Sequence, residues 1–191
     1  WLQVVTCGPG ESWVRLHHLA FDASVLDILV PLVSGGAVHL PDLDVVRDVQ
    51  RCARALVDSR ATSVLLTPSL ADQIMRFLPD EGLPALRVTV LGAEAVPIAV
   101  ASQWATRVMP RGGRVLNAYG PTESTVACIT GDLTSDDLSQ DGGGAPLGTP
   151  LPHAGVATVD SALRLVPPGV PGELLVAGES LATEYLGMPE E

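Results

Sequence analysis

Hydrophobic positions in the first two-thirds of the chain alternate between helical spacing and short continuous apolar runs. A helix is predicted from Asp44, which can cap it, to about Ser59, because apolar residues recur on one face at positions 45, 49, 53 and 56. A buried strand is expected next, at residues 63–67, and Ser69 can cap a further helix. This order of helix, strand and helix is the first unit of a repeating pattern.

The pattern continues with strands predicted at residues 87–91 and 114–118, and with a helix between them that begins near Pro97. Strands separated by helices of this length pair in parallel through right-handed crossovers. In open parallel sheets, ligands collect at the carboxyl ends of the strands. We therefore expect function in the loops that follow residues 67, 91 and 118.

The last third of the chain has a different character. Residues 135–144 are polar and glycine-rich, which is typical of an exposed loop. Three short strands are expected between Pro-Gly turns, at residues 155–160, 163–166 and 173–177. They predict a small antiparallel sheet packed beside the α/β layer, and residues 180–187 can begin a helix.

The predicted fold class is therefore α/β. A parallel-sheet α/β subdomain at residues 1–130 is expected to precede a small antiparallel β-barrel-like subdomain at residues 131–191. An acidic net charge of −11 disfavours nucleic-acid binding, because phosphate backbones are repelled. The chain has no apolar run of membrane-spanning length and no secretory signal at its start, so we expect a soluble cytoplasmic protein without membrane contact.

The cysteine and histidine spacing does not suggest a metal site. Cys7, Cys52 and Cys128 are far apart and form no C-x-x-C pair, so all three are expected to be reduced. All basic residues are arginines, and the 191 residues contain no lysine. Any mechanism that needs a lysine must therefore take it from outside this chain.

Residues 117–125 carry the most chemistry, because they lie where a predicted strand meets a turn and a helix start. Gly120 allows close backbone approach to a ligand, and the Thr122 hydroxyl with helix-start amides can hold a phosphate. The Glu123 carboxylate suits Mg²⁺, and the Tyr119 ring offers a flat surface for a base. The residues alone leave open an alternative, a Gly-Pro turn followed by a threonine helix cap.

The sequence Asn-Ala-Tyr-Gly-Pro-Thr-Glu at residues 117–123 resembles the core motif of nonribosomal peptide synthetase adenylation domains, members of the adenylate-forming, acyl-CoA synthetase-like superfamily. Three other segments agree in the order expected for that family. They are Phe-Asp-Ala-Ser-Val at 21–25, Leu-Gly-Ala-Glu-Ala at 91–95, and Gly-Glu-Leu-Leu-Val-Ala-Gly at 172–178. The resemblance therefore covers nearly the whole chain.

This resemblance implies an enzyme that activates an amino acid with ATP and Mg²⁺. The substrate carboxylate attacks the α-phosphate, which yields aminoacyl adenylate and pyrophosphate. The acyl group then passes to a phosphopantetheine thiol, so the implied partners are the peptidyl carrier and condensation domains of the same assembly line. Positioning and charge stabilisation dominate such catalysis.

By the same resemblance, the Asp22 carboxylate holds the α-ammonium of the substrate. A buried ammonium needs such a partner to offset its desolvation, although Asp22 as a helix cap is the alternative. The family's pocket-lining positions are all apolar here: Ala23, Leu26, Leu65, Val90, Gly92, Ala118, Val126 and Ala127. An apolar pocket penalises charged side chains, so we expect a neutral aromatic or bulky aliphatic amino acid.

For ATP, the resemblance implies that Asn117, Tyr119 and Gly120 contact adenine. Thr122 would contact a phosphate and Glu123 would bind the Mg²⁺, so these two are the implied catalytic residues. The family's lysine-bearing phosphate loop is expected before residue 1. Its ribose-binding aspartate and its C-terminal domain with the catalytic lysine are expected after residue 191. The chain alone is therefore expected to bind ATP weakly and to be inactive.

Three places depart from the family pattern. Leu26-Asp27 stands where Trp-Glu is frequent, Ala93 replaces a usual glycine, and Thr183-Glu184 stands where Arg-Gly is usual. Two rival functions also remain. One is an acyl- or aryl-CoA ligase, which would have no use for an ammonium-binding carboxylate, and the other is a non-catalytic scaffold or interaction remnant.

Overall fold

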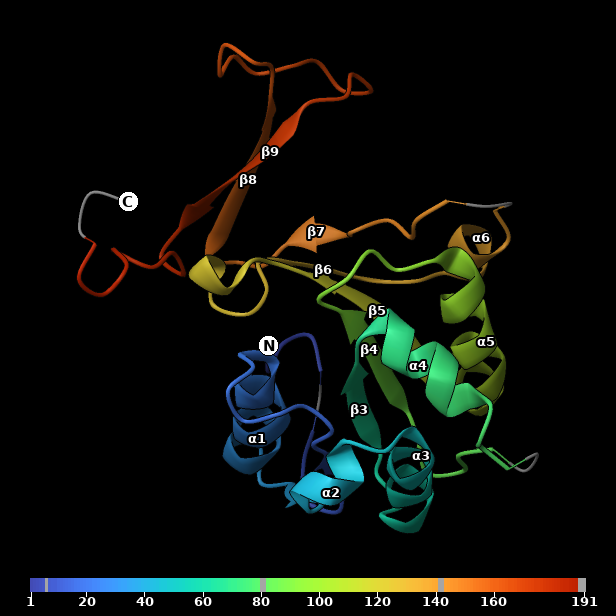
Figure 1. Cartoon of the computed structure of the whole chain (residues 1–191). Coiled ribbons are helices and arrows are strands. Elements are labelled where there is room, and N and C mark those ends of the chain that lie inside the picture. Colours follow the sequence, from blue (N-terminus) through green and yellow to red (C-terminus); the bar gives the residue numbers. More distant parts are fainter. Residues whose placement is uncertain (6, 80–81, 141–142, 189–191) are drawn as a thin grey trace.

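The computed structural model describes residues 1–5, 7–79, 82–140 and 143–188, and Figure 1 shows how its elements are arranged. Within these ranges, seven strands form one sheet in the order β2-β1-β3-β4-β5-β6-β7, and β8 and β9 form a separate sheet. The chain is therefore a mixed α/β structure with a parallel sheet, as the sequence predicts.

The first five strands of the large sheet are parallel to one another. They are β1 (Ser12–Val14), β2 (Ala37–His39), β3 (Ser63–Leu66), β4 (Val88–Gly92) and β5 (Arg114–Tyr119). The antiparallel strands β6 (Ile129–Asp132) and β7 (Thr149–Pro150) extend the sheet beyond β5. The three strands predicted from apolar runs are confirmed to within one residue at each end.

Helices cover both faces of these parallel strands. One face packs on α3 (Val49–Asp58), α4 (Pro68–Met75) and α5 (Ile98–Val108) through Val64, Leu66, Leu91 and Val115. The other face packs on α1 (Ala23–Val33) through Leu65, Val88, Val90, Leu116 and Ala118. Successive residues of a strand point to opposite faces, so burial of both faces explains why the strands are continuously apolar.

The helix predicted from Asp44 onwards is two helices. α2 (Leu43–Val46) ends before Asp48, and the Asp48 carboxylate then caps α3 by accepting a hydrogen bond from the Arg51 amide. Asp44 lies inside α2 and does not cap it. The prediction was wrong because an aspartate that bonds the backbone locally begins a new helix instead of continuing the previous one.

The cap of α4 was also placed wrongly. Thr67 caps the helix by accepting from the Leu70 amide, and Pro68 takes the first helical position. Ser69 instead donates its hydroxyl proton to Glu94 Oε1 at 2.7 Å. With proline at the first helical position, the cap lies two residues earlier than expected.

The last third of the chain confirms the antiparallel sheet and corrects its details. Strand β8 (Ala154–Val159) pairs with β9 (Glu173–Gly178), and Figure 1 shows this hairpin projecting from the body rather than packing beside it. The strand predicted at residues 163–166 is reduced to one bridge, between Leu165 and Val159. Residues 180–187 contain no helix, because this segment bonds to a distant turn described below.

The predicted polar loop at residues 135–144 begins with a helical turn, α6 (Ser135–Leu138), which Thr134 and Asp137 close as a capping box. Two 3₁₀ turns complete the elements: η1 (Met109–Arg111) and η2 (Thr122–Ser124). We retain as a proposal that residues 1–130 and 131–191 form two subdomains, with a boundary that falls inside β6. Within the described part of the chain, no helix has the length and apolar character needed to cross a lipid bilayer.

Candidate functional site

Two adjoining cavities open at the carboxyl ends of β3, β4 and β5, where the parallel sheet predicts a ligand site. The first has a volume of about 240 Å³ and lies between these strand ends and α1, and the second has about 370 Å³. Four residues line both cavities: Ala93, Ala118, Gly120 and Pro121. Ligands bound in the two cavities would therefore lie close to each other.

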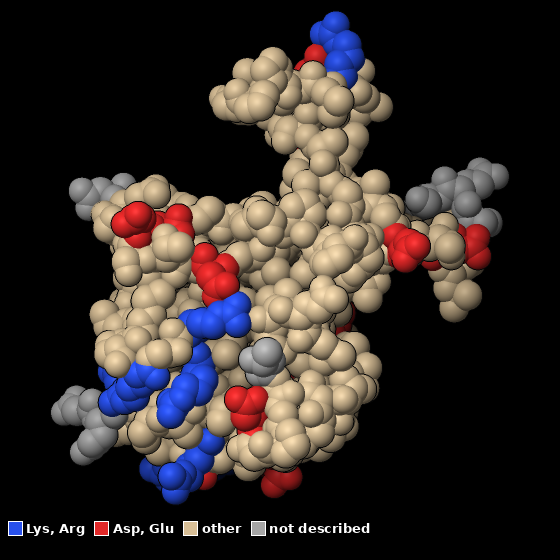
Figure 2. Space-filling model, turned by 180° about the vertical axis from the view of Figure 1, so that it is seen from behind, with Lys and Arg blue, Asp and Glu red and all other residues tan. Residues whose placement is uncertain are grey.

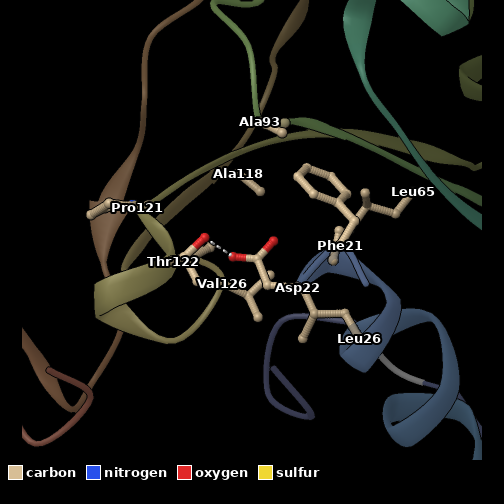
Figure 3. Close-up of a pocket in the computed structure, with 13 residues that line it drawn as sticks. Phe21, Asp22, Leu26, Leu65, Ala93, Ala118, Pro121, Thr122 and Val126 are labelled. Atoms are coloured by element: carbon tan, nitrogen blue, oxygen red, sulfur yellow. Dashed lines mark hydrogen bonds between the residues drawn. The ribbon is translucent and has the colours of Figure 1, made fainter. Parts of the chain in front are cut away.

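The first cavity gathers almost all of the residues expected to bind the amino acid (Figure 3). Asp22 and seven of the predicted apolar residues line it: Ala23, Leu26, Leu65, Gly92, Ala118, Val126 and Ala127. Val90 does not line it, because this residue is fully buried in the hydrophobic cluster under α1. Sequence reasoning missed Phe21 and Ala93 as lining residues, although both lie inside the quoted motifs.

Asp22 stands at the start of α1 but does not cap it. Its side chain makes no capping hydrogen bond, and its backbone is already helical, with φ −59° and ψ −31°. Its Oδ2 instead accepts a hydrogen bond from Thr122 Oγ1 at 2.6 Å, and Figure 3 shows the two side chains pointing toward each other. The alternative role of helix cap is therefore not used, and the carboxylate faces a cavity with otherwise mostly apolar walls.

The motif turn after β5 is short and strained. It contains the 3₁₀ turn η2, followed by Thr125 with φ 63° and Val126 with φ 70°. The left-handed region is unfavourable for β-branched residues and costs on the order of 1–3 kcal/mol each. A 3₁₀ turn starts here instead of the expected α-helix, so only the first amides of a short turn and the Thr122 hydroxyl remain as candidates to hold a phosphate.

The small residues of the site are needed by the protein backbone itself. A Cβ at Gly120 would lie 2.5 Å from Ala127 Cα, and a Cβ at Gly92 would lie 2.6 Å from the carbonyl oxygen of Ala118. The sequence prediction that Gly120 admits a ligand is thus refined, because its nearest neighbours are the residues that close the motif turn.

Asn117 and Tyr119 line the second cavity from β5. The Asn117 side chain is 2% exposed, and its Nδ2 donates to the carbonyl oxygens of Pro146, at 3.0 Å, and Ala145, at 3.4 Å. Because only the amide nitrogen can donate to a carbonyl, these bonds fix the orientation of the side chain. Its carboxamide oxygen is therefore available as an acceptor for an amino group.

Ala93 and Glu94 form the wall after β4. Ala93 has φ 66°, which explains why the resembling family usually has glycine at this position. Glu94 lines the second cavity, and its carboxylate accepts from both the amide and the hydroxyl of Ser69. This contact ties the loop after β4 to the start of α4, so that the wall is held from two elements.

Glu123, the expected Mg²⁺ ligand, is tied to the C-terminal segment. Tyr185 donates its hydroxyl proton to Glu123 Oε1, and the Ala182 amide donates to the Glu123 carbonyl at 2.7 Å. The hydrogen bond from Tyr185 lowers the pKa of the Glu123 carboxyl below its usual value. Sequence reasoning missed Tyr185, because no local pattern indicates a contact across 62 positions.

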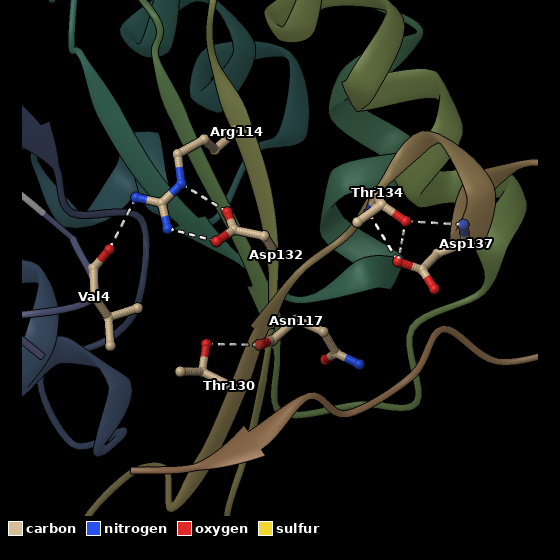
Figure 4. A network of polar contacts seen from close by, with 7 residues as sticks. All are labelled: Val4, Arg114, Asn117, Thr130, Asp132, Thr134 and Asp137. Atoms are coloured by element: carbon tan, nitrogen blue, oxygen red, sulfur yellow. Dashed lines mark hydrogen bonds and ion pairs between the residues drawn. The ribbon is translucent and has the colours of Figure 1, made fainter. Parts of the chain in front are cut away.

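A network of polar contacts supports the strands beneath the site (Figure 4). Arg114 forms a two-pronged ion pair with Asp132, at 2.6 and 2.7 Å, and also donates to the Val4 carbonyl. Thr130 Oγ1 donates to the Asn117 carbonyl at 2.9 Å. These bonds hold β6 against β5, which carries the motif.

The surface shows charge in separate places. On the face in Figure 2, uncharged residues cover most of the surface. Basic side chains gather in one region of the main body and also lie at the tip of the projecting part, and acidic groups lie in several patches.

A buried pair joins α1 to the segment before it, where His17 Nδ1 and Asp27 Oδ2 are 2.8 Å apart. Burial raises the pKa of Asp27, and the hydrogen bond with His17 partly opposes this shift. This pair is outside both cavities.

Comparisons with known proteins agree with this geometry. A family model described as AMP-binding enzyme matches residues 2–186. The dimodular nonribosomal peptide synthase of Bacillus subtilis (strain 168) is 36% identical over 186 residues, which cover 94% of this chain and 8% of that protein. Tyrocidine synthase 2 of Brevibacillus parabrevis is 34% identical over 182 residues, which cover 95% of this chain and 5% of that protein.

The chain is also similar in fold to a solved structure of a nonribosomal peptide synthetase. The four-domain nonribosomal peptide synthetase holo-AB3403, bound to AMP and glycine, superposes with a TM-score of 0.87 and 30% identity, and covers 99% of this chain and 14% of that one. Across eight curated relatives, which include the two named above, the chain spans only 2% to 8% of the relative's own length.

Proposed function

Because the chain belongs to the AMP-binding enzyme family, as part of a nonribosomal peptide synthetase adenylation domain, we propose that it activates an amino acid as aminoacyl-AMP within a larger protein. The observation that carries this proposal is the Asp22 carboxylate, which lies in the wall of the first cavity and bonds to Thr122 of the motif turn. The Asp22 carboxylate thus faces the first cavity, where we place the amino acid, and also bonds to Thr122, which we assign to an ATP phosphate.

The amino acid occupies the first cavity, with its ammonium on Asp22. Apart from Thr122, the side chains that line this cavity beyond Asp22 are apolar, among them Leu26, Leu65 and Val126. Such walls offer no partner for a charged side chain, so the preferred substrate is neutral and aromatic or bulky aliphatic. Discrimination between apolar substrates is only about 1–3 kcal/mol per methylene, so the proposal stops at this class.

ATP occupies the second cavity, with adenine beside Tyr119 and within reach of the fixed Asn117 side chain. Gly120 lies in the wall shared by both cavities, so the α-phosphate can lie near the carboxylate of the amino acid. Thr122 contributes its hydroxyl to a phosphate when the substrate ammonium takes over its place on Asp22.

The residues present fit Mg²⁺ if phosphates complete its coordination. Glu123 supplies one exposed hard oxygen ligand, and the described residues contain no cluster of three or more His, Cys, Asp or Glu that could hold a metal ion. Mg²⁺ typically binds through one or two carboxylates together with substrate phosphates and waters. Glu123 would hold the ion, which would supply positive charge to neutralise the phosphates.

In the reaction, a carboxylate oxygen of the amino acid attacks the α-phosphorus. The bond between the α-phosphorus and its bridging oxygen breaks, and pyrophosphate leaves with the electron pair. Asp22 orients the substrate by its ammonium, and the two cavities hold the reacting atoms together, which is the main source of rate enhancement. The acyl group then passes to a phosphopantetheine thiol on a carrier domain of the same protein.

Amino-acid-dependent exchange of labelled pyrophosphate into ATP tests the proposal. The full-length protein that carries this chain should exchange with neutral aromatic or bulky aliphatic amino acids and not with aspartate. The 191 residues alone, which contain no lysine, should give no exchange. Exchange with fatty or aryl acids but with no amino acid would support the CoA-ligase alternative, and no exchange with either class would support a non-catalytic role.

A further inference from the structure

The segment 180–185 holds the motif turn through three hydrogen bonds. Thr125 Oγ1 donates to the Ser180 carbonyl at 2.6 Å, and the Ala182 amide donates to the Glu123 carbonyl at 2.7 Å. The third bond joins two side chains, because the Tyr185 hydroxyl donates to Glu123 Oε1. Two of the bonds thus fix the backbone and rim of the turn, and the third acts on the Glu123 carboxylate itself.

An exposed glutamate side chain has several rotamers, so a metal that binds it must first select one of them. A hydrogen bond to one carboxylate oxygen limits this freedom and leaves the other oxygen to coordinate. A phenol is suited to this task because it is neutral and keeps its proton up to about pH 10, so it orients a carboxylate without cancelling its charge. A lysine or arginine at position 185 would instead compete with the cation.

We propose that Tyr185 is a positioning residue for the metal: its hydroxyl holds Oε1 of Glu123, so that Oε2 is presented to the cation of Mg·ATP. This inference rests on the proposed function, in which Glu123 is the metal ligand. In this role, Tyr185 does not coordinate the metal itself but acts on it through Glu123.

The variant Tyr185→Phe in the full-length protein removes only the hydroxyl. Pyrophosphate exchange is measured against Mg²⁺ concentration at saturating amino acid and fixed ATP. We expect the Mg²⁺ concentration for half-maximal rate to rise about three- to tenfold, the range that corresponds to loss of one ordinary hydrogen bond, while the rate at saturating Mg²⁺ changes less than twofold.

Two controls separate positioning from a general loosening of the turn. Thr125→Val removes the bond to Ser180 but leaves the Tyr185 hydroxyl, so it should not change the Mg²⁺ dependence. Leu186→Ala changes the fully exposed neighbour of Tyr185 and should also leave the Mg²⁺ dependence unchanged. An unchanged Mg²⁺ dependence in Tyr185→Phe, or the same rise in the half-maximal Mg²⁺ concentration in Thr125→Val, would overturn the inference.

Failure of the proposed function has a different signature, since the wild-type protein would then exchange no pyrophosphate with any amino acid. Binding of Mn²⁺ together with ATP, followed by electron paramagnetic resonance, still compares the metal site in wild type and Tyr185→Phe. Weaker Mn²⁺ binding in the variant supports the positioning role, and equal binding contradicts it.

Discussion

Replacement of Asp22 by asparagine tests the amino-acid site most sharply. Asparagine has nearly the same size and can still accept the hydrogen bond that Thr122 donates at 2.6 Å, but it has no charge for an ammonium. Removal of one partner from a fully buried ion pair costs about 3–5 kcal/mol. Asp22 is only half-buried, so we expect a smaller loss, near that of a charged hydrogen bond, of about 2–3 kcal/mol. This corresponds to a decrease of roughly 30- to 150-fold in kcat/KM for the amino acid.

The assay compares the amino acid with its deaminated analogue, both as substrates for adenylate formation by the full-length protein. The analogue has no ammonium, so Asp22→Asn should change its kcat/KM less than about threefold, which is under 1 kcal/mol. Asp44→Asn, at an exposed aspartate in α2 outside both cavities, is the matched control and should leave both substrates unaffected. An equal loss for amino acid and analogue would refute the reasoning, because Asp22 would then have a general structural role.

Three further substitutions test other parts of the site. Gly120→Ala places a Cβ 2.5 Å from Ala127 Cα and should lower the free energy of unfolding by about 1–3 kcal/mol, measured by urea denaturation. Asn117→Ala leaves the Pro146 carbonyl without its donor and should lower the free energy of unfolding by about 1–3 kcal/mol. The same variant should raise KM for ATP more than KM for the amino acid. Leu26→Trp fills part of the 240 Å³ cavity and should shift preference toward smaller amino acids, measured by exchange across a substrate panel. If Leu26→Trp left the substrate preference unchanged, the side chain of the amino-acid substrate would have to bind outside this cavity.

The parallel core was predictable because its strands are buried on both faces and appear as continuous apolar runs. β1 and β2 were missed because each has only three residues, too few for a periodic signal. The helix boundary at Asp48 depends on one local side-chain bond, and an equally suitable aspartate at position 44 precedes it. Local patterns therefore located the elements but not all of their ends.

The site was predictable only as far as its motifs are local. The resemblance located Asp22 and the apolar lining residues, but it also included Val90, which shares a strand face with Gly92 but is fully buried in the hydrophobic cluster under α1. It could not reveal that Asp22 bonds Thr122 across 100 positions, or that Tyr185 bonds Glu123. Such contacts depend on how β5, α1 and the C-terminal segment meet, which no single stretch of sequence encodes.

A crystal structure of the full-length protein with a non-hydrolysable aminoacyl-adenylate analogue tests the central claim most directly. The account predicts the ammonium nitrogen within about 3.2 Å of an Asp22 carboxylate oxygen, the amino-acid side chain against Leu26 and Leu65, and the adenine beside Tyr119. An ammonium group in solvent, with Asp22 still bonded only to Thr122 and the first cavity empty, would contradict it.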